Sequence, residues 1–276
     1  MWTLTGFADE ISPDLDEQLE LLSAESISYM ELRSLGNTNV LDLTDEEHKK
    51  IASAATERGI GISSIGSPIG KAPITDPFGP HLERFRRALR AADVMGSPYI
   101  RVFSFFIPEG HDPGDYREEV IERMGVLAGE AKHAGVTLLH ENEKDIYGDV
   151  PSRCVDILTG VDSPALRAAW DAANFVQCGI SHPYTDGYES LRPYIEYVHV
   201  KDALSGSGKV VPAGEGEGQW PDTLSALETS GFDGFFSLEP HLASAGPYSG
   251  FSGPELFSEA AGVFRGLLRN QGIAWA

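Results

Sequence analysis

The chain alternates short runs of β-branched and aromatic residues with longer segments in which apolar residues recur at helical spacing. The short runs predict eight strands, at 2–7, 27–32, 60–65, 99–105, 136–141, 166–171, 195–199 and 235–239. The longer segments predict helices at about 14–24, from 44 onward, and at 81–95, 115–133, 151–158, 187–191, 221–229 and 254–268. Thr44, with Glu47 three residues later, forms a capping box that marks the start of the second helix.

Eight strand and helix units in 276 residues match the count and size of a (β/α)8 TIM barrel. A doubly wound open sheet is the alternative. It is disfavoured because the first strand is followed by the acidic segment Gly6-Phe7-Ala8-Asp9-Glu10 instead of a glycine-rich phosphate turn. No linker, low-complexity tract or charge block divides the chain, so we expect a single TIM-barrel domain over residues 1–276.

Composition narrows the range of partners. The 21 Lys and Arg residues face 42 Asp and Glu residues, a net charge of −21, which disfavours nucleic acid as the main ligand. A hydrophobic fraction of 41% suffices for a core, and no apolar run approaches the ~20 residues of a membrane-spanning helix. The N-terminal segment does not resemble a secretory signal, so we expect a cytoplasmic protein. Cys154 and Cys178 lack metal-ligand spacing and are expected to be buried thiols.

Candidate chemistry lies at the ends of the later strands, where a TIM barrel builds its active site. Four of the last five predicted strands deliver a carboxylate or an imidazole there: Glu141, Asp171, His199 and Glu239. Alternation along each strand places Glu141 on the face of Leu139, and His199 on the face of Tyr197. All four could therefore point to the barrel axis.

Three carboxylates in one small site repel each other unless a cation compensates them. Together with the imidazole they suit one divalent ion, Mn²⁺, Co²⁺, Mg²⁺ or Zn²⁺, with positions open for substrate or water. The alternative is chance, because an acidic protein places some carboxylates at strand ends. Four on successive inner faces favour the metal.

These residues lie in motifs that resemble the xylose-isomerase-like sugar-phosphate isomerase/epimerase superfamily. The motifs are LLHENEKD, WDAANFVQCG, YVHVKDA, AGEGEGQW and GFDGFFSLEPH, and the resemblance runs over almost the whole chain. It implies a metal-dependent TIM barrel whose single divalent ion is bound by Glu141, Asp171, His199 and Glu239. The superfamily spans isomerases, epimerases, dehydratases and apurinic endonucleases, so the resemblance fixes the site better than the reaction.

The resemblance implies that Glu141 and Glu239 act as the acid/base pair, from opposite faces of a hydroxy-ketone whose C–H is acidified through an enediolate. The alternative is that these carboxylates are ligands only and that Lys201 carries the proton. Four further residues are candidate substrate contacts: Asn174, His182, Lys201 and His241. For the two histidines the alternative is a solvated loop position, and for Lys201 an ion pair with Asp202.

Two charges stand within otherwise apolar strands. Glu31 and Arg101 are each expected to point into the barrel, where they could meet as an ion pair or orient the substrate. The segment AGEGEG lacks the Walker spacing and carries Glu215 and Glu217, so it resembles the family's loop before a late helix and not a phosphate loop.

The leading function is thus an isomerase or epimerase of a keto-sugar or related polyhydroxy ketone. A dehydratase of the inosose or dehydroshikimate type is the alternative, in which His182 or His241 could supply an acid to the leaving hydroxyl. An abasic-site endonuclease is disfavoured by the charge of −21 and by only 8 His residues. A non-catalytic sugar-binding barrel stays open, as does formation of a homo-oligomer. An unphosphorylated substrate is preferred, because only Lys71, Arg101 and Lys201 suggest a phosphate contact.

Overall fold

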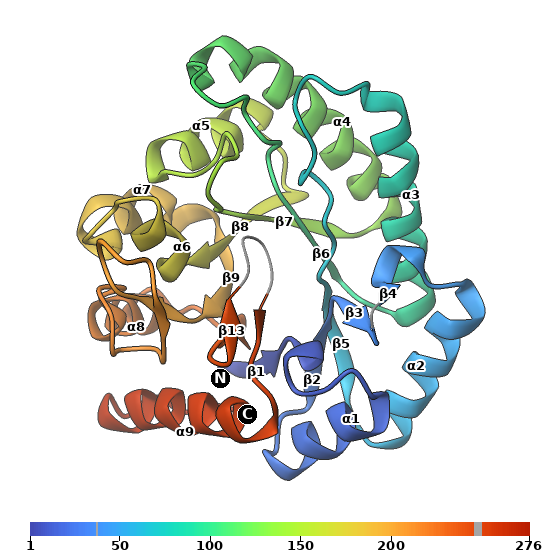
Figure 1. The fold of residues 1–276 in the computed structure, drawn as a ribbon, viewed down its shortest axis with the longest axis vertical. Helices are drawn as coiled ribbons and strands as arrows, with labels where there is room; N and C mark the ends of the chain where they lie inside the picture. Colours follow the sequence, from blue (N-terminus) through green and yellow to red (C-terminus); the bar gives the residue numbers. More distant parts are fainter. Residues whose placement is uncertain (37, 246–249) are drawn as a thin grey trace.

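All eight predicted strands pair side by side in one parallel sheet. The computed structural model describes residues 1–36, 38–245 and 250–276 (Figure 1). The sheet runs in the order β1-β12-β9-β8-β7-β6-β5-β2, and an isolated bridge between Phe7 and Glu31 joins its two edges. The strands are β1 Thr3–Gly6, β2 Tyr29–Leu32, β5 Gly61–Ile65, β6 Tyr99–Val102, β7 Thr137–Glu141, β8 Leu166–Asp171, β9 Ile195–Val200 and β12 Phe235–Leu238. The fold is a single (β/α)8 TIM barrel, as the sequence predicts.

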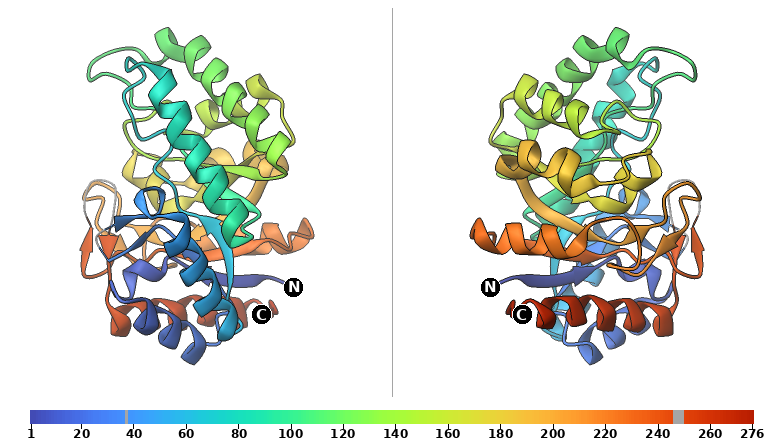
Figure 2. Two further views of the ribbon diagram at one scale, coloured as in Figure 1. Left: turned by 90° about the vertical axis from the view of Figure 1, so that its right-hand side faces the viewer. Right: turned by 90° about the vertical axis from the view of Figure 1, so that its left-hand side faces the viewer.

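Helices surround the strands on the outside (Figures 1 and 2). They are α1 Leu15–Ala24, α2 Asp45–Glu57, α3 Phe78–Met95, α4 Arg117–Ala134, α5 Pro151–Val161, α6 Ala172–Gln177, α7 Glu189–Leu191, α8 Trp220–Thr229 and α9 Pro254–Asn270. The capping box at Thr44 is confirmed, with Glu47 bonded to both the backbone N–H and the hydroxyl of Thr44. Of the helices described, none is both long and apolar enough to cross a membrane.

The structure differs from the expected elements mainly in the loops. The helix α6 follows β8 without a break, because Asp171 ends the strand and also caps the helix by accepting the N–H of Asn174. The predicted helix at 187–191 is reduced to α7, and a π-helical turn over Tyr184–Tyr188 precedes it. Short 3-10 helices occupy Ala8–Glu10, Val40–Asp42, Pro113–Tyr116 and Arg192–Tyr194.

Three small hairpins form in loops that follow barrel strands. They are β3 Ser34–Leu35 with β4 Thr38–Asn39, β10 Asp202–Ala203 with β11 Val210–Val211, and β13 Ser244–Ala245 with β14 Gly250–Phe251. Their parent strands are β2, β9 and β12. The hairpins therefore extend the barrel wall at the carboxyl ends of the strands.

The barrel interior is closed by an apolar layer below these ends. Leu139, Ala169 and Tyr197 pack there as one buried cluster, with Tyr99 and Phe235 against them. The expected faces of β7 and β9 are thus correct, because Leu139 and Tyr197 point inward two residues before Glu141 and His199. Access to the polar residues above this layer is from the carboxyl ends of the strands.

Candidate active site

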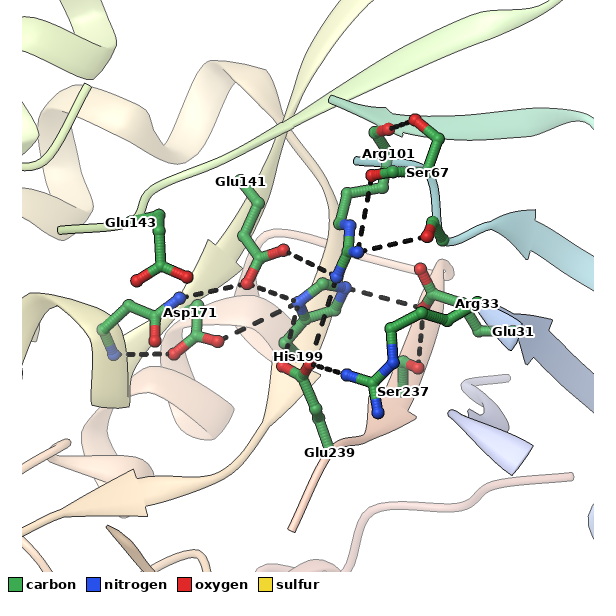
Figure 3. Close-up of polar contacts among 12 residues, drawn as sticks. Glu31, Arg33, Ser67, Arg101, Glu141, Glu143, Asp171, His199, Ser237 and Glu239 are labelled. Carbon is green, nitrogen blue, oxygen red and sulfur yellow. Dashed lines mark hydrogen bonds and ion pairs between the residues drawn. The ribbon is translucent and has the colours of Figure 1, made fainter. Parts of the chain in front are cut away.

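The structure brings together the four residues expected to bind a metal. Glu141 ends β7, Asp171 ends β8, His199 lies in β9, and Glu239 directly follows β12. One potential ligand atom from each lies within 4.8 Å of the others, and each residue is at most 3% exposed (Figure 3). Strand register explains the convergence: Asp171 pairs with His199, and His199 pairs with Ser237, two residues before Glu239.

The imidazole of His199 has one nitrogen turned to the carboxylates and the other turned away. Nδ1 lies 3.2 Å from Oε1 of Glu141, 3.7 Å from Oε2 of Glu239 and 3.9 Å from Oδ2 of Asp171. Nε2 lies 3.5 Å from Oε2 of Glu31. Neither ring nitrogen makes a hydrogen bond of good geometry. Nδ1 is therefore a buried donor atom aimed at three carboxylate oxygens.

Negative charge is crowded around His199 and Asp171. Burial lowers the pKa of His199, but Glu141 and Glu31 outweigh burial and raise that pKa to about 10. Burial also raises the pKa of Asp171, and despite Lys201 the neighbouring Glu141 and Glu239 help to bring it to about 6. Both raised pKa values mean that His199 and Asp171 bind protons more readily, because negative charge is crowded around them. A divalent cation meets the same need, so the residues present fit such an ion.

Three cationic side chains also bind the clustered carboxylates. Nζ of Lys201 lies 2.9 Å from Oδ2 of Asp171 and 2.7 Å from Oε2 of Glu239. Arg101 donates to Oε2 of Glu141 at 3.2 Å, and Arg33 donates to Oε1 of Glu239 at 3.1 Å. Glu141 and Glu239 thus each turn one oxygen to His199 and the other to an arginine.

The predicted ion pair between Glu31 and Arg101 is wrong, because each charge has other partners. Glu31 accepts the hydroxyls of Tyr197 at 3.0 Å and Ser237 at 2.8 Å. Arg101 instead reaches Glu141 and the backbone carbonyls of Gly66 and Ser67. A register shift between Met30 and Glu31 accompanies this arrangement. The carboxylate of Glu31 lies beside Nε2 of His199.

Three of the four expected substrate contacts lie at the cluster. Lys201 binds Asp171 and Glu239. The side-chain amide of Asn174 donates to Oε1 of Glu141 at 3.0 Å and to the carbonyl of Asn142 at 2.9 Å, so it holds a carboxylate in place. Nε2 of His241 lies 2.9 Å from Oε1 of Glu10 and 3.4 Å from Oε1 of Glu239. The structure does not bring His182 into this group, since that side chain is exposed. Contact of these residues with substrate stays a prediction.

The sequence reasoning missed polar residues after the first two strands. Asp9 accepts Nε of Arg33 at 2.8 Å, and Glu10 accepts the backbone N–H of His241 at 2.9 Å. Arg33 directly follows β2, and Asp9 and Glu10 come soon after β1. The rule that strand ends carry the chemistry, applied to every strand, finds all three.

Asp202 organises the glycine-rich segment instead of pairing with Lys201. Its carboxylate accepts the backbone N–H groups of Ala203, Gly214, Gly216 and Gly218, at 2.8 to 3.1 Å. A Cβ at Gly216 or Gly218 would lie 2.6 or 2.7 Å from Oδ1 of Asp202, so both positions need glycine. The N–H groups of the loop therefore donate to a carboxylate of this chain and not to a phosphate, which agrees with the expectation that the segment is no phosphate loop.

The protein is thus a TIM barrel that gathers buried carboxylates and an imidazole at the ends of its strands. The model of the xylose isomerase-like TIM barrel family matches residues 19–267, and the chain belongs to this family. No curated protein matches the chain at the level of sequence.

Several solved structures share the fold. A D-tagatose 3-epimerase-like protein is 16% identical with a TM-score of 0.79, and the match covers 99% of this chain and 100% of the other. The probable 3-DHS dehydratase AsbF of petrobactin synthesis from Bacillus anthracis is 17% identical, with a TM-score of 0.74 and coverage of 96% and 98%. The IOLI protein, solved with a zinc atom, is 16% identical, with a TM-score of 0.74 and coverage of 97% of each chain. At these identities the similarity shows the fold alone.

Proposed function

We propose that this protein is a divalent-metal-dependent isomerase or epimerase of a keto-sugar or related polyhydroxy ketone. The observation that carries the proposal is the group of four ligand atoms, from Glu141, Asp171, His199 and Glu239, within 4.8 Å of one another at the ends of four strands. Mn²⁺, Co²⁺, Mg²⁺ and Zn²⁺ all suit three carboxylates and one imidazole. The zinc atom of the IOLI structure supports the choice of a divalent ion.

The bound ion would supply Lewis acidity, which makes the C–H beside a ketone easier to deprotonate. The residues of this chain would then move the proton. Glu141 and Glu239 come from β7 and from the end of β12, so they approach the centre from different sides. One carboxylate would take the proton from the substrate carbon, and the other would return a proton to the neighbouring carbon or to the opposite face.

The remaining groups would orient this pair. Asn174 fixes Oε1 of Glu141, while Arg101 holds Oε2 of the same carboxylate. Lys201 and Arg33 hold the two oxygens of Glu239. Burial lowers the chance of water competing for the proton, because both glutamates are at most 3% exposed.

A dehydratase is the second candidate function, and the position of His241 supports it. His241 lies between Glu10 and Glu239, and these carboxylates raise its pKa against the lowering effect of burial. A protonated imidazole beside the proposed base could protonate a hydroxyl that leaves as water. The similarity to a probable dehydratase supports the same alternative.

A screen of keto-sugars and inosose-like ketones with Mn²⁺ in deuterated water tests the proposal. We expect metal-dependent incorporation of deuterium beside the ketone of at least one compound, with product mass otherwise unchanged. Loss of one water would identify the dehydratase. Absence of metal-dependent exchange across the panel would contradict both enzymes and favour a sugar-binding barrel. A small-molecule ligand, a cytoplasmic location and a homo-oligomer all stay predictions.

A further inference from the structure

A cavity of about 570 Å³ at the carboxyl ends of the strands is lined by more cationic than acidic side chains. Three cationic side chains, Arg33, Lys71 and Arg101, line it, with Asp9 as the one acidic residue among the lining side chains described. The whole chain has twice as many acidic residues as basic ones, 42 against 21. We refer to Arg33, Lys71 and Arg101 together as the cationic wall.

Two buried phenyl rings separate and support the three charges. Arg33 lies 4.8 Å and Arg101 5.1 Å from the ring centre of Phe7. Arg101 also lies 4.8 Å, and Lys71 4.2 Å, from the ring centre of Phe103. Both rings are fully buried. The cations are therefore stacked on apolar faces that orient them and limit their contact with water.

The segment that carries Lys71 is built into the barrel mouth. Gly70 has a φ of +89°, and a Cβ there would meet the carbonyl oxygen of Phe103 at 2.0 Å. The N–H of Gly70 donates to Nε2 of His81 at 2.9 Å, and its carbonyl accepts the N–H of Phe105. Backbone constraints on both sides thus fix the point from which Lys71 extends.

The wall is joined to the proposed metal ligands. Arg101 binds Oε2 of Glu141, and Arg33 binds Oε1 of Glu239. A divalent ion held by Glu141 and Glu239 would neutralise part of the charge that these glutamates now offer to the arginines. The positive charge facing the cavity would then be available to an anion beside the reacting ketone.

A carboxylate suits the donors that remain better than a phosphate does. Arg33 already uses Nε on Asp9, one terminal nitrogen on Glu239 and the other on the carbonyl of Gly250. Arg101 spends both terminal nitrogens on protein oxygens, and Lys71 lies 3.2 Å from Glu143. A phosphate dianion would need several unused donors for three oxygens, whereas a carboxylate carries one charge on two oxygens.

We propose that the substrate is a polyhydroxy keto acid, and that the cationic wall of Arg33, Lys71 and Arg101 binds its carboxylate while the ketone lies at Glu141 and Glu239. This inference rests on the proposed function and makes its substrate class narrower. The unphosphorylated substrate expected from the sequence is thereby narrowed to an acid, because cations outnumber acids among the described residues that line the cavity.

Binding of two matched ketones to the Mn²⁺-loaded protein tests the proposal. L-Sorbose and 5-keto-D-gluconate share their ketone and the configuration of their three secondary hydroxyl carbons, and differ in that a carboxylate replaces a terminal hydroxymethyl group. Calorimetric titration should give a dissociation constant for 5-keto-D-gluconate at least tenfold lower than for L-sorbose, with the difference narrowing at high salt. D-Fructose 6-phosphate should bind more weakly than the keto acid. Equal affinities, tightest binding of the phosphate, or no binding of the keto acid would overturn the proposal.

The variant Lys71→Gln locates the effect. It should weaken binding of 5-keto-D-gluconate at least fivefold more than binding of L-sorbose, and Lys71→Arg should keep the preference. Lys132→Gln makes the same charge change on the exposed surface of α4 and should leave the preference as in the wild type. An unchanged preference in a folded Lys71→Gln protein would overturn the role of the wall.

The two proposals fail in different ways. Metal-dependent deuterium exchange on neutral ketones, without preferential binding of the keto acid, would contradict the carboxylate-binding role of the cationic wall. It would leave the proposed isomerase or epimerase function standing. Preferential binding of the keto acid without exchange on any ketone would support the carboxylate-binding role of the cationic wall. It would contradict the proposed enzymatic function.

Discussion

The carboxylate of Glu31 lies 3.5 Å from Nε2 of His199, on the side of the imidazole opposite to the clustered carboxylates. Tyr197 and Ser237 hold that carboxylate through their hydroxyl groups, and both residues of the pair are fully buried. Once a metal binds and the imidazole is neutral, a carboxylate in this position would favour the tautomer with its proton on Nε2 and leave the lone pair of Nδ1 for the metal. Glu31 is thus a positioning residue for the proposed ligand.

Replacement of Glu31 by Gln should weaken binding of Mn²⁺ about 10- to 100-fold, because the amide no longer polarises or orients the imidazole in the same way. Competition with a chromogenic chelator measures the affinity. Glu196→Gln, on the same strand as His199 but bonded to Tyr99, is the matched control. Equal loss in both variants, or no loss in Glu31→Gln, would contradict the role given to Glu31.

Replacement of Glu239 by Gln should lower kcat/KM for exchange by about 10²- to 10⁴-fold at saturating Mn²⁺, since an amide does not take a proton from carbon. Exchange is followed by the deuterium content of the ketone. Circular dichroism should show an intact barrel, and Glu255→Gln on the exposed start of α9 should retain full activity. A folded, metal-loaded Glu239→Gln protein with ordinary turnover would remove Glu239 from the acid/base pair.

Replacement of Asp202 by Asn should cost about 1–3 kcal/mol of unfolding free energy, because four backbone N–H groups lose a charged acceptor. Urea unfolding gives this value, and limited proteolysis should show faster cleavage within residues 204–218. Asp222→Asn, at the exposed first turn of α8, is the control. Equal stability of the two variants would mean that the glycine-rich segment holds its shape without Asp202.

The four clustered residues could be predicted from the sequence because each lies at or next to the end of a strand. In a barrel, strand ends are adjacent in space even when they are far apart in the chain. The same rule identifies Arg33 and Glu10, whose positions after the first two strands carry the same information. Charge patterning alone did not reveal them, because Glu10 is one of 42 acidic residues and Arg33 is one of 21 basic residues in the chain.

Other features depend on contacts that local sequence does not contain. The partner of Glu31 depends on the register shift at Met30, and Tyr197 and Ser237 approach from strands more than 160 residues away. Lys71 reaches the cavity through the left-handed backbone of Gly70 and its contact with His81. Such loop conformations follow from packing across the barrel mouth, so strand and helix patterns do not predict them.

Lowering the pH should weaken the fold through His81. Burial, together with the nearby charges of Arg123 and Arg84, lowers the pKa of His81 from 6.5 to about 4. Nε2 of His81 accepts the N–H of Gly70, and it can do so only while it is unprotonated. Between these two pKa values the unfolded chain binds a proton that the folded protein does not, so stability falls as the pH drops from 6.5 towards 4.

The variant His81→Gln keeps an acceptor but does not titrate. The difference in unfolding free energy between pH 7 and pH 5 should therefore be about 1 kcal/mol smaller than in the wild type, a value reduced for the half-buried position. Urea titrations at the two pH values measure it. His133→Gln, on the exposed end of α4, should follow the wild type. Parallel behaviour of all three proteins would contradict the lowered pKa of His81 in the folded protein.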